Sequence, residues 1–219
     1  FPESILYDIC KKQDINVATF EGGLSYNNKY SIEFNYGITA QHRFNFDKNI
    51  KIPESKLNSS LNLMKTQWVE GENVKENYFS NEANLDLSDK KIISIFGNVS
   101  WDTSQFISNT IFTSIFDWLE SLKEVIKEFP EYTFIFRAHP GENRKLKQTF
   151  YGVGNWLKDN LSSDLKNVLI IDSDNKLNSY EIIKSSNIVL VYNSTIGIES
   201  TMLGKKSYAA ASTHYSNQP

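Results

Sequence analysis

Hydrophobic and polar positions alternate most regularly in the second half of the chain. Short apolar runs rich in β-branched and aromatic residues predict strands, and amphipathic segments between them predict helices. The expected strands cover residues 91–96, 132–137, 168–172, 188–192 and 206–211. The expected helices cover residues 106–129, 145–160, 178–185 and 195–203. We expect a break near Gly152 and Gly154 in the second helix, and Gly204 as the left-handed cap that ends the last one.

Continuous apolar strands that alternate with helices are typical of a parallel sheet with helices on both faces. Right-handed crossovers bring the carboxyl ends of all these strands to one edge of the sheet. Ligands of such sheets bind at that edge. The residues that directly follow the strands are therefore the candidates for function.

The first half of the chain shows a weaker pattern. Its expected elements are a helix over 4–14, a strand over 16–20, a turn at 21–23, a helical or strand piece near 30–39 and a helix within 53–74. Residues 76–90 are polar and acidic. We therefore expect three parts, which are residues 1–52, a helical connector over 53–90 and an α/β domain over 91–219.

Composition excludes several classes of protein. The 219 residues include 23 Lys and Arg against 26 Asp and Glu, a net charge of -3 that argues against a nucleic-acid binder. A single cysteine excludes an internal disulfide. No apolar run approaches the ~20 residues that span a bilayer, and no signal pattern opens the chain. The first residue is Phe rather than Met, so we expect a piece of a longer cytoplasmic protein.

One candidate motif follows the strand over 132–137. Pro140 disfavours the helical region for His139, which holds the imidazole at the carboxyl edge of the sheet. Imidazole is a donor for phosphate oxygens, and Arg137 is a second candidate phosphate partner. The alternatives are that His139 only makes local hydrogen bonds, and that the alternation of side chains along the strand points Arg137 elsewhere.

A second motif follows the strand over 188–192. Ser194 and Thr195 open a helix, where backbone N–H groups and the helix dipole favour a phosphate. Glu199, one turn further on, is a candidate acceptor for ribose hydroxyls. The alternatives are a helix cap at Ser194 or Thr195 and a first-turn carboxylate that complements the dipole at Glu199.

Two further places carry candidate chemistry. Asn98 and Asp102 follow the first strand of the α/β domain, although Asp102 is also a candidate cap for the next helix. Glu21 stands beside Gly22 and Gly23 and is a candidate general base, or part of an ordinary turn. No metal-site spacing, dinucleotide-binding glycine motif, phosphate-binding loop or nucleophile elbow is present in the sequence.

Taken together, the segments 98–102, 137–142 and 185–206 resemble the capsule polysaccharide biosynthesis family of bacterial glycosyltransferases, which includes enzymes that use CMP-Kdo. The resemblance covers about residues 91–211. It implies the Rossmann-like, nucleotide-binding half of a GT-B fold, with residues 1–52 as a remnant of the acceptor-side domain.

The resemblance also implies roles for single residues. His139 and Pro140 would contact the donor near its phosphate, Ser194 and Thr195 would bind that phosphate, and Glu199 would hold the ribose. Asn98 and Asp102 would line the cleft, and Glu21 would activate the acceptor hydroxyl. No metal and no cofactor is implied, since the nucleotide sugar is a substrate.

We therefore expect a glycosyltransferase that moves a sugar from a donor such as CMP-Kdo to a capsular or surface polysaccharide or a glycolipid. It would act in the cytoplasm or at the inner face of the membrane, with membrane association through parts outside this sequence. The alternatives are a CDP-glycerol glycerophosphotransferase, a UDP-sugar epimerase-like enzyme, and a non-catalytic nucleotide-binding or scaffolding module.

Overall fold

The computed structural model describes residues 9–16, 19–22, 32–35, 51, 53–64, 66, 90–100, 109–143, 149–161, 165–213 and 215. The chain divides into two compact units. One comprises Phe1–Lys48 with Asn217–Pro219, and the other comprises Asn49–Ser216.

The described part of the smaller unit contains a helical turn at residues 9–12 and two antiparallel strands, β1 (Thr19–Gly22) and β2 (Ile32–Asn35). A turn was expected at residues 21–23, but the first two of these residues belong to a strand. Glu21 and Gly22 still belong to β1, and the Cα of Glu21 pairs with that of Glu33. Pairing with β2 extends the strand past the position at which the sequence pattern weakens.

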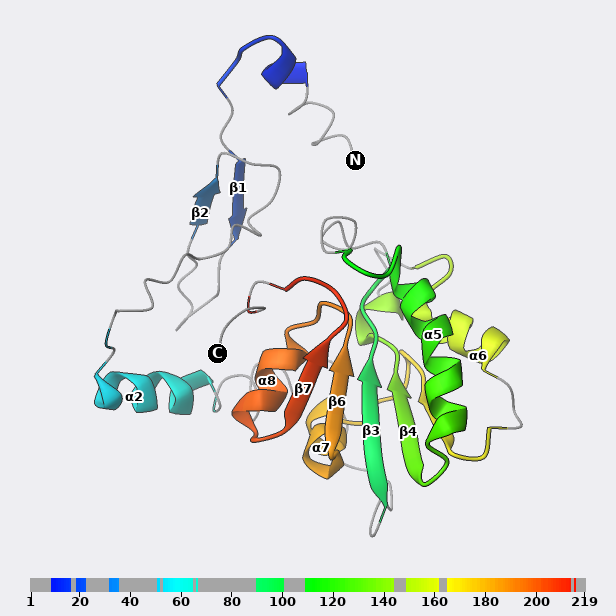
Figure 1. Ribbon diagram of the computed structural model, residues 1–219. Coiled ribbons are helices and arrows are strands. Elements are labelled where there is room, and N and C mark those ends of the chain that lie inside the picture. Colours follow the sequence, from blue (N-terminus) through cyan, green and yellow to red (C-terminus); the bar gives the residue numbers. More distant parts are fainter. Residues whose placement is uncertain are drawn as a thin grey trace. The chain divides into compact units, whose positions relative to one another are not determined.

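The larger unit is built on a five-stranded sheet in which every neighbouring pair is parallel (Figure 1). Its strands are β3 (Lys91–Phe96), β4 (Tyr132–Arg137), β5 (Val168–Ile171), β6 (Ile188–Val191) and β7 (Lys206–Ala209). They lie in the order β5-β4-β3-β6-β7. The predicted α/β, Rossmann-like fold class is confirmed.

The described α-helices of this unit are α2 (Glu54–Met64), α5 (Ile115–Glu128), α6 (Val153–Asn160), α7 (Ser179–Ser185) and α8 (Ile196–Met202). All lie within the expected segments, but α5 and α6 begin several residues later than predicted. The Ser114 hydroxyl caps α5 by accepting from the Asp117 N–H at 3.1 Å. Gly152 is the cap of α6 rather than a break inside it. Gly204 follows α8 with φ +74, as predicted.

Two hydrophobic clusters cover the two faces of the sheet. Ile93 and Ile95 of β3 point into the cluster that contains buried residues of α5 and α6. Ile92 and Phe96 alternate with them and point into the cluster that contains buried residues of α7, against which Ile196 of α8 packs. This alternation explains why the strands read as continuous apolar runs.

Side chains also fix how β6 lies beside β3. The Ile92 N–H donates to the Asn187 side-chain oxygen at 2.7 Å, and the Asn187 N–H donates to the Ile92 carbonyl at 2.9 Å. The buried hydroxyls of Ser94 and Ser186 are hydrogen-bonded to each other at 2.9 Å. These contacts hold together two strands that lie far apart in the sequence.

Candidate functional site

The strand order creates a topological switch point between β3 and β6. After β3 the chain continues to α5 on one face of the sheet, and after β6 it continues to α8 on the other face. In open α/β sheets, ligands bind outside the carboxyl ends of the strands at this point. The segments that follow β3, β4 and β6 therefore form the candidate site.

The segments after β3 and β6 contact each other directly. The Asn193 N–H points to the side-chain oxygen of Asn98 at 3.5 Å, and Asn98 is buried. The structure thus brings Asn98 next to the segment that carries Ser194. Asp102, the other residue expected here, lies outside the described residues.

The His139 turn lies beside this pair. Pro140 opens a short 3-10 helix (Pro140–Asn143), and the Gly141 N–H donates to Nδ1 of His139 at 2.9 Å. Because Nδ1 accepts, the proton of the neutral imidazole lies on Nε2, which is a donor. A Cβ at Gly141 would lie 2.8 Å from Nδ1 and 3.4 Å from a methyl group of Val99, so the turn packs closely against the segment after β3.

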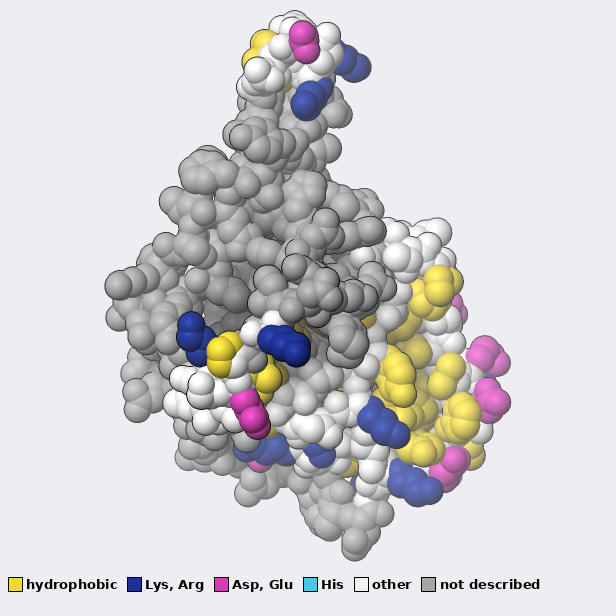
Figure 2. Space-filling view, turned by 60° about the vertical axis from the view of Figure 1, so that its left-hand side comes forward, with side chains coloured by type: hydrophobic (Ala, Val, Ile, Leu, Met, Phe, Trp, Pro, Cys, Tyr) yellow, Lys and Arg dark blue, Asp and Glu magenta, His cyan; other side chains and the backbone are white. Residues whose placement is uncertain are grey.

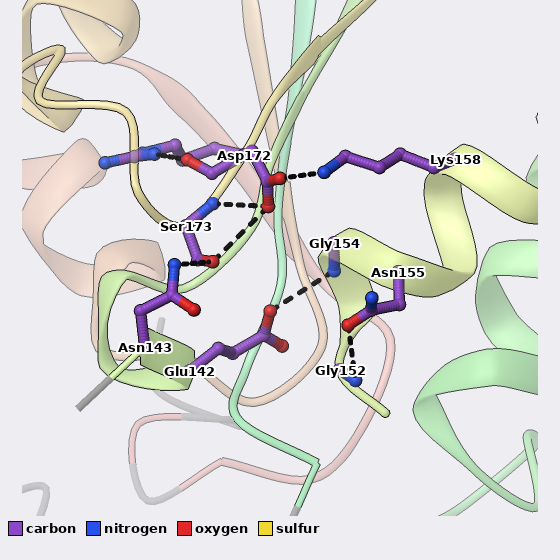
Figure 3. A network of polar contacts seen from close by, with 9 residues as sticks. Glu142, Asn143, Gly152, Gly154, Asn155, Lys158, Asp172 and Ser173 are labelled. Carbon is purple, nitrogen blue, oxygen red and sulfur yellow. Dashed lines mark hydrogen bonds and ion pairs between the residues drawn. The ribbon is translucent and has the colours of Figure 1, made fainter. Parts of the chain in front are cut away.

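Glu142 ties this turn to the start of α6 (Figure 3). Its carboxylate, 4 % exposed, accepts from the N–H groups of Val153 at 2.7 Å and Gly154 at 3.2 Å. A carboxylate is stabilised at a helix N-terminus by these donors and by the helix dipole. Burial raises the pKa of Glu142. The charge of Asp172 also raises this pKa, whereas the two N–H groups lower it.

The network of Figure 3 continues from the turn to the segment after β5. Asn143 donates to the Ser173 hydroxyl at 2.8 Å, and the Ser173 N–H donates to Asp172 at 2.7 Å. Asp172 also pairs with Lys158 of α6. Burial works to raise the pKa of Asp172, but Lys158 and Ser173 hold it below its ordinary value. The His139 turn is thus held by two neighbouring elements.

Arg137 binds backbone carbonyls of the protein itself. It is 1 % exposed, and its guanidinium donates to the carbonyls of Asp172 and of Asn175, the latter at 2.8 Å. Burial lowers its pKa to about 10, against the charges of Asp172 and Asp174. Because these bonds occupy both terminal nitrogens, Arg137 holds the segment after β5 in place. The phosphate contact that the sequence suggests for Arg137 stays a prediction.

Ser194 and Thr195 lie at the start of α8. Ser194 is buried, and its hydroxyl accepts from the Ile196 N–H at 3.3 Å. The backbone carbonyl of Ser194 accepts from the Tyr215 hydroxyl. Thr195 is exposed, makes no capping bond and hydrogen-bonds to Glu199. The sequence pattern left a helix cap at Ser194 or Thr195 open as an alternative to phosphate binding. In the structure, the Ser194 side chain makes this local bond at the start of α8.

Glu199 lies behind these two residues rather than on the surface. It is 7 % exposed and accepts from the Tyr180 hydroxyl at 2.9 Å. Burial raises the pKa of Glu199, and the hydrogen bonds from Tyr180 and Thr195 oppose that effect.

The structure therefore brings together Asn98, His139, Pro140, Ser194 and Thr195 along one edge, with Glu199 beneath them. Glu21 belongs to β1 in the other unit. Sequence reasoning missed Glu142, Asp172 and Tyr180. A signal exists only for Glu142, which stands directly after the His-Pro-Gly turn.

The described residues provide neither a metal cluster nor a membrane-spanning helix. Among them, no group of three or more His, Cys, Asp or Glu side chains is placed to hold a metal ion. None of the helices within the described ranges combines the length and apolar character that crossing a bilayer requires. On the face of the molecule drawn in Figure 2, basic and acidic side chains are interspersed over the described surface, without a continuous basic stripe.

Comparison with known proteins identifies the fold. No family model and no curated protein sequence matches the chain. Among solved structures, Thermosulfurimonas dismutans KpsC, a beta Kdo 2,4 transferase, matches 90 % of this chain and 55 % of its own with a TM-score of 0.57 and 14 % identity. The beta Kdo 2,7 transferase of the same KpsC matches 76 % of this chain and 45 % of its own, with a TM-score of 0.46 and 22 % identity.

The chain spans about half the length of these transferases. The similarity confirms the predicted resemblance to capsule Kdo transferases at the level of the fold. It leaves the donor, the acceptor and the roles of single residues to be argued from the site itself.

Proposed function

We propose that the chain binds the donor of a glycosyltransferase that moves a sugar from a CMP-linked donor, such as CMP-Kdo, to a surface polysaccharide or glycolipid. The observation that carries the proposal is the meeting of Asn98, the His139 turn and the Ser194 segment at the switch point between β3 and β6. The fold shared with a Kdo transferase at a TM-score of 0.57 supports it.

His139 is proposed to donate its Nε2–H to the donor phosphate. The support is that Nδ1 already accepts from Gly141, which leaves Nε2 as the protonated nitrogen of the neutral ring. Ser194 and Thr195 are proposed to bind the same phosphate with their hydroxyls, and Asn98 and Pro140 to border the nucleotide. Asp102 stays in this proposal as a further residue of the segment after β3.

Glu199 is proposed to accept hydrogen bonds from the ribose hydroxyls. Its carboxylate lies one helical turn behind Thr195 and hydrogen-bonds to that side chain. A negatively charged acceptor one helical turn from the residues proposed to bind the phosphate suits the ribose, which is joined directly to the phosphate in CMP.

The proposed reaction breaks the bond between the anomeric carbon of the sugar and the phosphate oxygen of the donor. The acceptor hydroxyl forms the new bond to that carbon, and Glu21 takes the hydroxyl proton as general base. CMP leaves with the electron pair of the broken bond. Donors from His139 and the Ser194 segment stabilise the charge that develops on its phosphate.

The domain assignment belongs to the same proposal. Residues 1–52 would be part of an acceptor-side domain, residues 53–90 a connector and residues 91–219 the donor domain. The whole enzyme would then contain more of the acceptor side than this chain does, since the chain spans about half of the solved transferases.

Calorimetric titration of the purified chain with CMP, CDP, UMP and UDP tests the proposal. We expect CMP to bind most tightly, and His139→Ala to weaken CMP binding by roughly tenfold or more, because a bond to a charged phosphate is lost. Lys127→Ala is the control, since Lys127 is exposed on α5 and pairs only with Glu124 in a surface salt bridge. Circular dichroism checks that each variant is folded.

The other outcomes lead to different functions. Preference for CDP would favour the glycerophosphotransferase, and preference for UDP would favour UDP-sugar chemistry. If the folded chain bound none of the four nucleotides, the donor-site proposal would be rejected in favour of a scaffolding module.

A further inference from the structure

Tyr180 and Glu199 join the two helices that cover one face of the sheet. Tyr180 lies in the first turn of α7 and Glu199 in the first turn of α8, so both lie near the carboxyl ends of the strands. The Tyr180 hydroxyl donates to Oε2 of Glu199 at 2.9 Å. Tyr180 is 8 % exposed and Glu199 is 7 % exposed, so water competes little for this bond.

This contact bears on the charge of Glu199. Burial alone disfavours the carboxylate, and the hydroxyls of Tyr180 and Thr195 act against burial by stabilising the charged form. Among the described residues, the titratable groups that interact with Glu199 are Tyr180 from α7 and Tyr215 from the segment after β7. Burial and Glu199 raise the pKa of Tyr180 above its ordinary value, so its hydroxyl stays a donor at neutral pH.

We propose that Tyr180 is a positioning residue for the donor site. Its hydroxyl holds the Glu199 carboxylate in one orientation behind the Ser194–Thr195 segment. The inference rests on the proposed function, in which Glu199 accepts from the ribose. Thr195 approaches Glu199 from the start of the same helix, whereas Tyr180 approaches from a different helix. Of these two bonds, the one from Tyr180 therefore fixes the carboxylate relative to a second helix.

The test is CMP binding by Tyr180→Phe, measured by calorimetry as a function of pH. The variant removes one hydroxyl and keeps the buried ring. We expect CMP binding to weaken roughly three- to tenfold at neutral pH, the usual range for one lost hydrogen bond. We also expect the acid loss of CMP affinity to begin at a higher pH than in the wild type, because Tyr180 no longer stabilises the charged carboxylate.

Two controls separate positioning from general packing. Tyr151→Phe removes a bond between the same two kinds of group at an exposed position, from the tyrosine hydroxyl to the Asp159 carboxylate at 3.0 Å, and is expected to leave CMP binding and its pH profile unchanged. In a double-mutant cycle, Tyr180→Phe is expected to have little further effect in the Glu199→Gln background, since Tyr180 acts through the Glu199 carboxylate.

Each outcome decides a different point. If the wild type binds CMP and Tyr180→Phe matches it over the whole pH range, the positioning role is refuted while the proposed function stands. An effect of Tyr180→Phe that is as large in Glu199→Gln as in the wild type also refutes it. If the wild type binds no nucleotide, the proposed function fails, and the positioning role fails with it.

Discussion

Glu142 and Glu199 are two buried carboxylates that belong to no salt bridge among the described residues. Glu142 accepts from the N–H groups of Val153 and Gly154, whereas Glu199 accepts from hydroxyl groups. Dipoles rather than cations therefore stabilise both charges. In both residues burial outweighs these dipoles, so the pKa of each lies above its ordinary value.

The raised pKa of Glu142 predicts a pH effect on stability. The folded state binds the Glu142 proton more readily than the unfolded chain, whose ordinary value is 4.5. Its contribution to the free energy of unfolding therefore increases as the pH falls from neutral towards about 4.5. We expect wild type to gain stability relative to Glu142→Gln over that interval, as measured by urea unfolding at a series of pH values.

Taking the difference between wild type and variant cancels the titrating groups that do not interact with Glu142. Glu120→Gln is the matched control, because Glu120 is exposed on α5 and pairs with Lys123. A stability difference between wild type and Glu142→Gln that is constant or shrinks on acidification would contradict the prediction.

At the scale of single elements, α6 illustrates how a helix is fitted to its neighbours. Its N-terminal N–H groups are satisfied by Glu142, a residue from the preceding turn, because the cap Gly152 has no side chain. A Cβ at Gly152 would lie 2.5 Å from the Glu142 carboxyl carbon. The glycine therefore makes room for the carboxylate that replaces its missing cap.

Gly154 makes similar room for Asp172. Alanine in place of helical glycine usually stabilises a helix by about 1 kcal/mol. Here a Cβ would overlap with the Asp172 carboxylate and lie 3.3 Å from the Cβ of Ala138. We expect Gly154→Ala to lower the free energy of unfolding by about 1–3 kcal/mol instead, as measured by urea unfolding.

The Asp172→Ala background supplies the control for that substitution. It removes the oxygen that a new methyl group would meet, so Gly154→Ala should cost less there than in the wild type. Equal costs in both backgrounds would show that the carboxylate is not the obstacle.

The sequence predicted element types and order in the second half well, but not where each helix begins. Strands β3 and β4 were predicted to the residue, because their apolar runs are bounded by polar residues. The start of α5 at Ile115, directly after the cap Ser114, was missed, because the apolar residues before it extend the helical pattern. Glu142 and Tyr180 were missed because their partners lie 11 and 19 residues away, beyond any local pattern.

At the scale of the whole larger unit, stability is concentrated in the middle of the sheet. β3 pairs with both β4 and β6 and is buried over most of its length, whereas β7 is one of the two edge strands and is mostly exposed. Amide exchange in a native protein is slowest where backbone hydrogen bonds are most deeply buried.

Hydrogen exchange followed by mass spectrometry checks this arrangement. We expect peptides from β3 and β4 to exchange more slowly than peptides that cover β7, because opening the edge strand exposes little of the core. Faster exchange in β3 than in β7 would contradict the strand order.

The pairing of β3 with β6 also sets the order in which the chain can assemble its candidate site. The contacts of Asn187 with Ile92 and of Asn193 with Asn98 each join residues 95 positions apart. Closing so long a loop costs entropy that must be offset by contacts formed at the same time. During synthesis, β3, β4 and β5 leave the ribosome before β6 does. The sheet can therefore begin from its first three strands, and a ribosome-bound chain acquires both sides of the switch point only when β6 arrives.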